Sequence, residues 1–177
     1  MHKLLILVST VLLAACNFQS STPRTVTEAR SDTPSNQPCS FNWATQTLPD
    51  LSAQVLAAMQ TAGLNGISVT AEAYGENCYD TRTNEPVSFT AMETDFHLTA
   101  QVKVLTDKGQ LGNLLERILI VLDGFPTGSI PGPLPGYIGV SFQAGDDELR
   151  LWFPASDGVS ARDQGLHGAA LFEKLLK

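Results

Sequence analysis

The sequence predicts an α+β domain with one antiparallel sheet of about four to five strands and two main helices on one face. Apolar residues alternate with polar ones in several stretches, which is the pattern of strands with one buried face. Two segments, 47–63 and 106–126, instead carry apolar residues at helical spacing. The chain has 177 residues, of which 43% are hydrophobic and 16% are charged, and this composition is typical of globular proteins.

The first half of this fold is predicted as strand, helix and strand. Phe41 to Thr45 alternates apolar and polar side chains, and Ile67 to Tyr74 does so again. Between them, Thr47-Leu48-Pro49-Asp50 is typical of a helix start, with Thr as the cap and Pro in the first turn. Gly63 is expected to end this helix, because glycine accepts the left-handed conformation that closes many helices.

A long strand is predicted from Val87 to Val104, with an irregularity in its middle. Apolar residues occupy odd positions up to Ala91 and even positions from Met92 onward. A change of phase by one residue exchanges the two faces of a strand. We therefore expect a β-bulge, or a bend between two pairings, at this point.

The second helix is expected to lie at the centre of the core. Asp107 is predicted to cap it, and apolar residues from Leu111 to Phe125 form the strongest helical stripe in the chain. Residues 126–136 hold four prolines and three glycines, which predicts a stiff loop. Strands over Tyr137–Ala144 and Leu149–Phe153 are expected to complete the sheet.

The order of these elements is compatible with a duplicated strand-helix-hairpin unit. The alternative is an α+β sandwich without internal symmetry. The globular domain is expected to cover residues 39–155. Residues 156–177 are predicted to be a C-terminal tail, in which apolar residues between Leu166 and Leu176 permit a short amphipathic helix that Gly165 and Gly168 weaken.

The first residues have the composition of a secretory signal. Lys3 precedes an apolar run from Leu4 to Leu13, which is too short for a membrane-spanning helix of roughly 20 residues. The ending Leu13-Ala14-Ala15-Cys16 resembles the lipobox of bacterial lipoproteins. The resemblance implies a diacylglycerol on the sulfur of Cys16, removal of residues 1–15 and, usually, a further acyl chain on the new amino terminus. An ordinary signal peptide without lipidation is the alternative.

Residues 16–38 are predicted to be the lipidated cysteine and a disordered tether, because Asn17 to Pro38 is rich in Ser, Thr, Pro and Asn and lacks apolar periodicity. The implied partner is a lipid bilayer, bound through the acyl chains on Cys16. We expect a lipid-anchored protein on a cell membrane or outer membrane that faces an extracytoplasmic space. The formal net charge of −7 argues against nucleic acid as a partner.

Cys39 and Cys78 are the two cysteines that remain after Cys16. In an exported chain such a pair predicts a disulfide, and a pair of buried free thiols is the alternative. Neither cysteine has a second one at the CxxC spacing of zinc sites. The sequence therefore predicts neither a metal nor a cofactor.

Glu93, Asp95 and His97 form the best candidate cluster for acid–base chemistry or metal binding. They alternate along one predicted strand and therefore share a face. Neighbouring members are about 6.8 Å apart along the strand, so two of them are close enough to hold one metal or to act as an acid–base pair. The simpler interpretation is the solvent-exposed face of a sheet.

No nucleophile elbow, zinc-protease, phosphate-loop or dinucleotide motif occurs in the sequence. The stretches Tyr74–Cys78 and Met92–Phe96 resemble those of uncharacterised bacterial lipoproteins, a likeness that implies no particular activity. We therefore interpret the chain as a non-catalytic binding or envelope-organising lipoprotein, with an envelope protein as a candidate partner.

Two other functions stay open at this point. One is a metal-assisted or acid–base enzyme that uses Glu93, Asp95 and His97. The other is a sensor that holds a small apolar ligand between the sheet and the helices. An apolar cavity above about 300 Å³ would favour the sensor.

Overall fold

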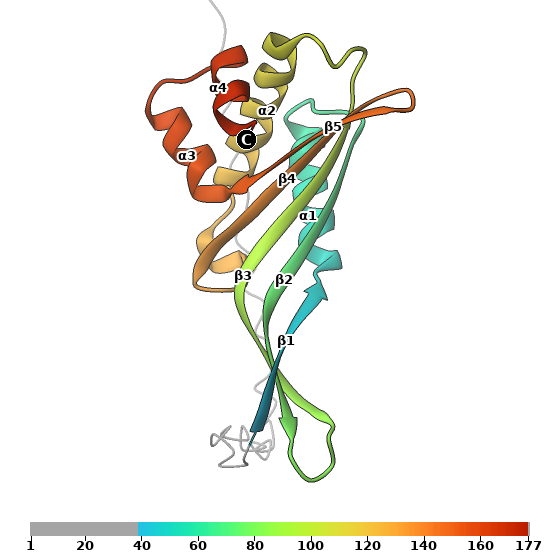
Figure 1. Ribbon diagram of the computed structural model, residues 1–177, viewed down its shortest axis with the longest axis vertical. Coiled ribbons are helices and arrows are strands. Elements are labelled where there is room, and N and C mark those ends of the chain that lie inside the picture. Colours follow the sequence, from blue (N-terminus) through green and yellow to red (C-terminus); the bar gives the residue numbers. More distant parts are fainter. Residues whose placement is uncertain (1–38, 177) are drawn as a thin grey trace, which may run out of the picture. The chain divides into compact units, whose positions relative to one another are not determined.

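Five strands, hydrogen-bonded in the order β1-β2-β3-β4-β5, form the sheet of the computed structural model, which describes residues 39–176 (Figure 1). The predicted leader, the predicted lipidation at Cys16 and the predicted tether lie outside the described residues. The strands are β1 (Cys39–Thr47), β2 (Ile67–Asp80), β3 (Pro86–Gln101), β4 (Leu134–Ala144) and β5 (Asp147–Pro154). The helices of this part of the chain are α1 (Pro49–Thr61), α2 (Lys108–Asp123), the short 3₁₀ helix η1 (Thr127–Ser129), α3 (Ala155–Asp163) and α4 (Gly168–Leu175).

The predicted α+β class and number of strands are confirmed, but the sheet is mixed rather than wholly antiparallel. β4 runs parallel to β3, whereas the other neighbouring strands are antiparallel. The physical reason is α2, which carries the chain back along the sheet so that β4 begins beside the middle of β3. By contrast β1 and β2, which flank α1, are antiparallel. The two strand-helix-hairpin units are therefore not equivalent.

The hydrophobic core lies between one face of the sheet and the helices, with α2 at its centre as predicted. Leu111, Leu115 and Ile118 of α2 are at most 1% exposed. The Asp107 side chain accepts a hydrogen bond from the Gln110 N–H at 2.9 Å, which confirms the predicted cap. Burial of a stripe on one helix thus fixes the position of the longest helix of the domain.

The start of α1 differs from the prediction, because Thr47 belongs to β1 and Leu48 takes the cap position. The hydroxyl of Ser52 instead donates to the Leu48 carbonyl at 2.8 Å and accepts from the Ala71 N–H at 2.8 Å. This hydroxyl therefore links the first turn of α1 to β2. The predicted end of the helix is confirmed, since Gly63 has φ +72°.

The predicted β-bulge is present. Tyr74 pairs with Glu93 and Gly75 pairs with Ala91, which leaves Met92 as the extra residue of β3. A Cβ on Gly75 would overlap the backbone of Thr90, so only glycine allows the two strands to approach this closely. The bulge explains why the apolar residues of β3 change phase between Ala91 and Met92.

The C-terminal segment is part of the folded core, in contrast to the tail predicted from the sequence. Residues 155–163 and 168–175 form α3 and α4, and Leu171, Phe172 and Leu175 of α4 are at most 1% exposed. Gly168 lies against Gly112 of α2, where a Cβ would overlap the Gly168 backbone. Glycine therefore serves close helix packing here, and the weak helix propensity that argued against α4 is outweighed by burial.

β1 and the adjoining ends of β2 and β3 extend beyond the helices (Figure 1), and we call residues 39–47, 75–80 and 86–91 the β-arm. The predicted disulfide is present: Cys39 of β1 is bonded to Cys78 of β2, with Cα atoms 5.2 Å apart. Closing a loop of this length contributes about 4 kcal/mol on the chain-entropy model. The bond therefore secures a strand that has little core of its own.

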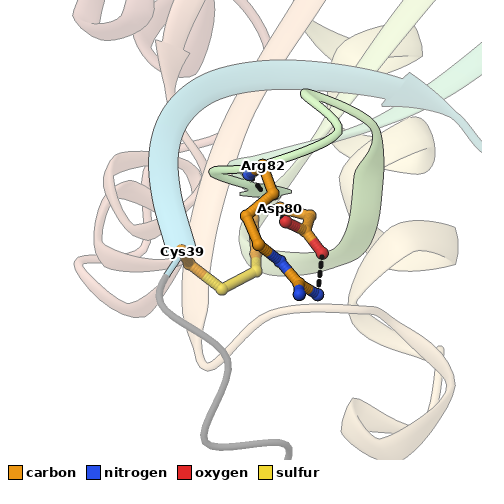
Figure 2. The surroundings of a disulfide bond; sticks show 4 residues. Cys39, Asp80 and Arg82 are labelled. Atoms are coloured by element: carbon orange, nitrogen blue, oxygen red, sulfur yellow. Dashed lines mark hydrogen bonds and ion pairs between the residues drawn. A yellow bond between two sulfur atoms is a disulfide. The ribbon is translucent and has the colours of Figure 1, made fainter.

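Asp80 shapes the turn at the tip of the β-arm (Figure 2). Its carboxylate accepts a hydrogen bond from the Arg82 N–H at 2.8 Å and lies 3.6 Å from the Arg82 guanidinium. The hydrogen bond from the Arg82 backbone, more than the guanidinium charge, holds the pKa of the Asp80 carboxyl below its usual value. The turn therefore stabilises the ionised form of the Asp80 carboxyl.

We expect Gly112→Ala to lower the free energy of unfolding by about 1–3 kcal/mol, because the new methyl group must displace α4. Gly128→Ala is the matched control, since a Cβ at Gly128 has no atom within 4 Å. Urea unfolding of both variants measures the difference. Equal stability of the two would contradict the close packing of α2 on α4.

Candidate functional site

The strand β3 supplies both faces of the domain with functional candidates. Thr94 and Phe96 point into the helical side and are buried. Glu93, Asp95 and His97 lie on the opposite side, where they pair with Tyr74, Glu72 and Thr70 of β2. We call this second side the open face, because the helices pack on the other one (Figure 1).

The candidate cluster does not converge on one point. An Asp95 carboxylate oxygen accepts a hydrogen bond from the Tyr137 N–H at 2.7 Å, so this side chain joins β3 to β4. The Nε2 atom of His97 lies 3.6 Å from a carboxylate oxygen of Glu72. Among residues 39–176, no group of three or more His, Cys, Asp and Glu side chains is placed to hold a metal ion.

Aromatic rings stand on the open face beside these carboxylates. The ring of Trp152 is stacked between Tyr137, at 5.3 Å, and His97, at 5.1 Å between centroids. Trp43 of β1 stacks on Tyr74 of β2 at 5.2 Å. These contacts explain how large rings are accommodated on an exposed sheet surface.

A depression of about 510 Å³ lies on the open face next to Trp152. Glu148 and Arg150 form an ion pair at 2.8 Å on its wall. The hydrogen bond from the Arg150 guanidinium lowers the pKa of the Glu148 carboxyl, and the same contact raises the pKa of Arg150. These two charges are paired with one another, so neither is free to bind a charged ligand.

A larger, mainly apolar cleft of about 680 Å³ lies on the helical side of the sheet. It is bounded by the end of α2, the loop after α2, the start of β4 and α3. Its volume falls within the range of small-molecule pockets. The apolar residues that line it are Phe96, Leu119, Leu122, Phe125, Ile130, Leu134, Ile138 and Val159.

The cleft exists because α3 carries small side chains where it faces the sheet. Ala155, Ser156 and Ser160 of α3 line the cleft and are too short to fill it. Gly158 lies close to Leu119 and Phe153, so α3 is held near α2 and β5 at that point. The helix is therefore in contact with the core at Gly158, and a space is left beside it.

The opposite wall depends on glycines in the loop before β4. Gly132 has φ +94°, and a Cβ on it would come within 2.8 Å of the backbone of Met92 and Glu93. A Cβ on Gly136 would overlap the Thr94 carbonyl. The Thr94 hydroxyl donates to the Pro131 carbonyl at 2.6 Å, and this side chain is 2% exposed. The loop is thus held against β3, and β4 begins at Leu134, earlier than predicted.

Polar groups gather at the edge of the cleft. Arg162 of α3 lies 3.4 Å from the Asp123 carboxylate at the end of α2. Asp163 and Gln164 are exposed beside them. The arrangement can bind an apolar group inside and a polar end group at the edge, but it offers no acid–base pair within the cleft.

Sequence reasoning did not identify any cleft residue as functional. Leu119, Leu122 and Ile138 have the pattern of ordinary core positions, and only packing shows that space is left beside them. A partial signal was present in residues 126–136, whose prolines and glycines predict a stiff loop. No family model, curated protein or solved structure shows significant similarity to the chain.

We expect Thr94→Val to lower the free energy of unfolding by about 1–2 kcal/mol, because it leaves the Pro131 carbonyl without its hydroxyl donor. Hydrogen exchange of residues 130–136 should become faster, since this bond holds the loop on β3. Thr99→Val, on the open face of the same strand, is the control. Unchanged exchange in the Thr94 variant would show that the loop is held by other contacts.

Proposed function

We propose that the chain is a lipid-anchored, extracytoplasmic binding module whose cleft between α2, α3 and β4 holds a small apolar ligand. The single observation that carries the proposal is the cleft itself, which is large and mainly apolar. A mainly apolar cleft of this size favours an apolar ligand, because binding removes apolar surface from water. Glu93, Asp95 and His97 lie on the other side of the sheet and take no part in the proposed binding.

The lining also sets the class of ligand. A hydrocarbon chain or an aromatic group of drug-like size would contact Phe96, Leu122 and Ile138. Each methylene that is removed from water contributes about 0.8 kcal/mol. A polar end group would remain at the edge, near Arg162 and Asp123. We therefore propose that the ligands are amphipathic molecules with a short apolar part.

The proposed anchor is the acylated Cys16. Its support is the Leu-Ala-Ala-Cys ending of the leader and the disulfide between Cys39 and Cys78, a bond typical of exported proteins. No helix within residues 39–176 has the length and apolar character needed to cross a membrane. Two or more acyl chains hold a protein stably on a bilayer, whereas one binds only marginally.

We expect Cys16→Ser to abolish incorporation of a radioactive fatty acid and to release the chain from membranes. Cys39→Ser is the matched control, because it removes a cysteine but leaves the proposed lipidation site. Labelling of cells, followed by separation of membranes and soluble material, measures both effects. An acyl label that survives in Cys16→Ser would contradict lipidation at this residue.

We expect the purified protein to bind one equivalent of N-phenyl-1-naphthylamine, an apolar dye that fluoresces in dry surroundings. Val159→Phe should weaken binding at least about tenfold, because Val159 lines the cleft and a larger side chain fills it. Ile120→Phe is the control: Ile120 is 50% exposed on α2 and does not line the cleft.

A second filling variant, Ala155→Leu, should reproduce the loss of dye binding, with circular dichroism to verify that each variant is folded. Binding that is equal in Val159→Phe and Ile120→Phe would place the dye elsewhere. A wild-type protein that shows no saturable binding would contradict the proposed function.

A further inference from the structure

Within residues 39–176, β1 is an edge strand, and one side of its backbone has no neighbouring strand. It pairs with β2 over nine residue pairs, from Cys39 to Thr47, and the sheet ends there. Residues 40–43 and 45–47 are exposed. Phe41 and Trp43 are 61% and 59% exposed. The strand therefore offers both backbone hydrogen-bonding groups and apolar surface to a partner.

The two edges of the sheet differ in their protection. Exposed edge strands are usually guarded by charged residues or proline, which prevent pairing with another strand. β5, at one edge, carries Asp147, Glu148, Arg150 and Pro154 in eight residues. β1, at the other edge, has the sequence CSFNWATQT and contains neither a charged residue nor proline. Of the two edges of the described sheet, the β1 edge is thus the one without such protection.

The register shows which residues of β1 face this edge. Leu48 continues the β1–β2 register opposite Ala71, and its N–H donates to the Ala71 carbonyl at 2.8 Å. In an antiparallel pair, hydrogen-bonded residues alternate with residues that are not bonded to that partner. Odd-numbered residues from Cys39 to Thr47 therefore direct their N–H and C=O groups outward, and Trp43 lies at the centre of this series.

We propose that two copies of the chain pair through β1, antiparallel, about a two-fold axis at Trp43. In this register Trp43 lies opposite Trp43 of the second copy, Phe41 lies opposite Thr45, and Cys39 lies opposite Thr47. All outward backbone groups of the strand are then paired in about ten hydrogen bonds. The interface is self-complementary, as two-fold symmetry requires.

Charge favours a second copy as the occupant of this edge. The chain carries a net charge of −7, so most surfaces of two copies repel one another. β1 itself carries no charged side chain, and the carboxylates opposite it, on Glu72, Glu76 and Asp80, belong to β2. The Trp43–Tyr74 stacks of the two copies would continue into one row of four rings. Because β5 is guarded, pairing stops at a dimer.

Cross-linking of the full-length protein, purified in detergent, tests the register. Directly opposed residues in an antiparallel pair have Cα atoms about 5.5 Å apart, within reach of a disulfide. We expect mild oxidation to join most Trp43→Cys chains into dimers. Ser40→Cys is the matched control, because residue 40 lies opposite residue 46 in this register and two copies of residue 40 would be about 20 Å apart along the strands. A mixture of Ser40→Cys and Gln46→Cys chains should form the mixed dimer in preference to either like dimer, because residues 40 and 46 lie opposite one another in this register, and this pair retains Trp43.

A charge on the edge tests the association itself. Thr45→Lys should weaken dimerisation at least tenfold in sedimentation velocity, whereas Asp147→Lys on β5 should leave it unchanged. Equal cross-linking at residues 40 and 43, a monomer at all concentrations, or assemblies larger than a dimer would each overturn the proposal. A cross-link from residue 43 to a different protein in intact cells, without a dimer, would assign the edge to another partner and overturn it as well.

Discussion

Burial of the apolar face of α2 against the sheet is the constraint on which the rest of the domain depends. Leu111, Leu115 and Ile118 are almost fully removed from solvent, and each such side chain contributes about 1.5–3 kcal/mol of transfer free energy. With α2 fixed in this place, the chain has to return beside the middle of β3, which makes β4 parallel to β3. The end of α2, the start of β4 and α3 then meet around one space. The crossover therefore brings the walls of the cleft together, and the small side chains of α3 leave the space between them.

Local patterns in the sequence were sufficient for the elements that depend on neighbouring residues. The change of phase at Met92 predicts the bulge, and Asp107 with the stripe after it predicts α2. Such patterns do not predict contacts between residues that are far apart in the sequence. Gly168 reads as a helix breaker in the sequence, yet in the fold it allows α4 to touch Gly112. The hydrogen bond from Thr94 to Pro131 spans 37 residues and leaves no periodic signal.

The candidate site was predicted less well than the fold, and for a related reason. Alternation along β3 predicts that Glu93, Asp95 and His97 share a face. It does not predict that the buried residues between them, Thr94 and Phe96, line a cleft. A pocket forms where the side chains of several helices and strands together do not fill the space between them. Ala155 and Ser160 matter because they are small where α3 faces the sheet. No single stretch of sequence contains that information.

The bulge in β3 has a consequence for how the length of this chain can vary in evolution. Met92 has no partner on β2, whereas Ala91 and Glu93 are paired on either side of it. Deleting Met92 would restore regular alternation and still leave Ala91 and Glu93 on the faces they now occupy. A homologous sequence one residue shorter at this point would thus retain both surfaces of the sheet. An alignment gap opposite Met92 would therefore leave the fold unchanged. The same gap between Glu93 and His97 would turn residues that line the cleft toward the open face, and residues of the open face toward the cleft.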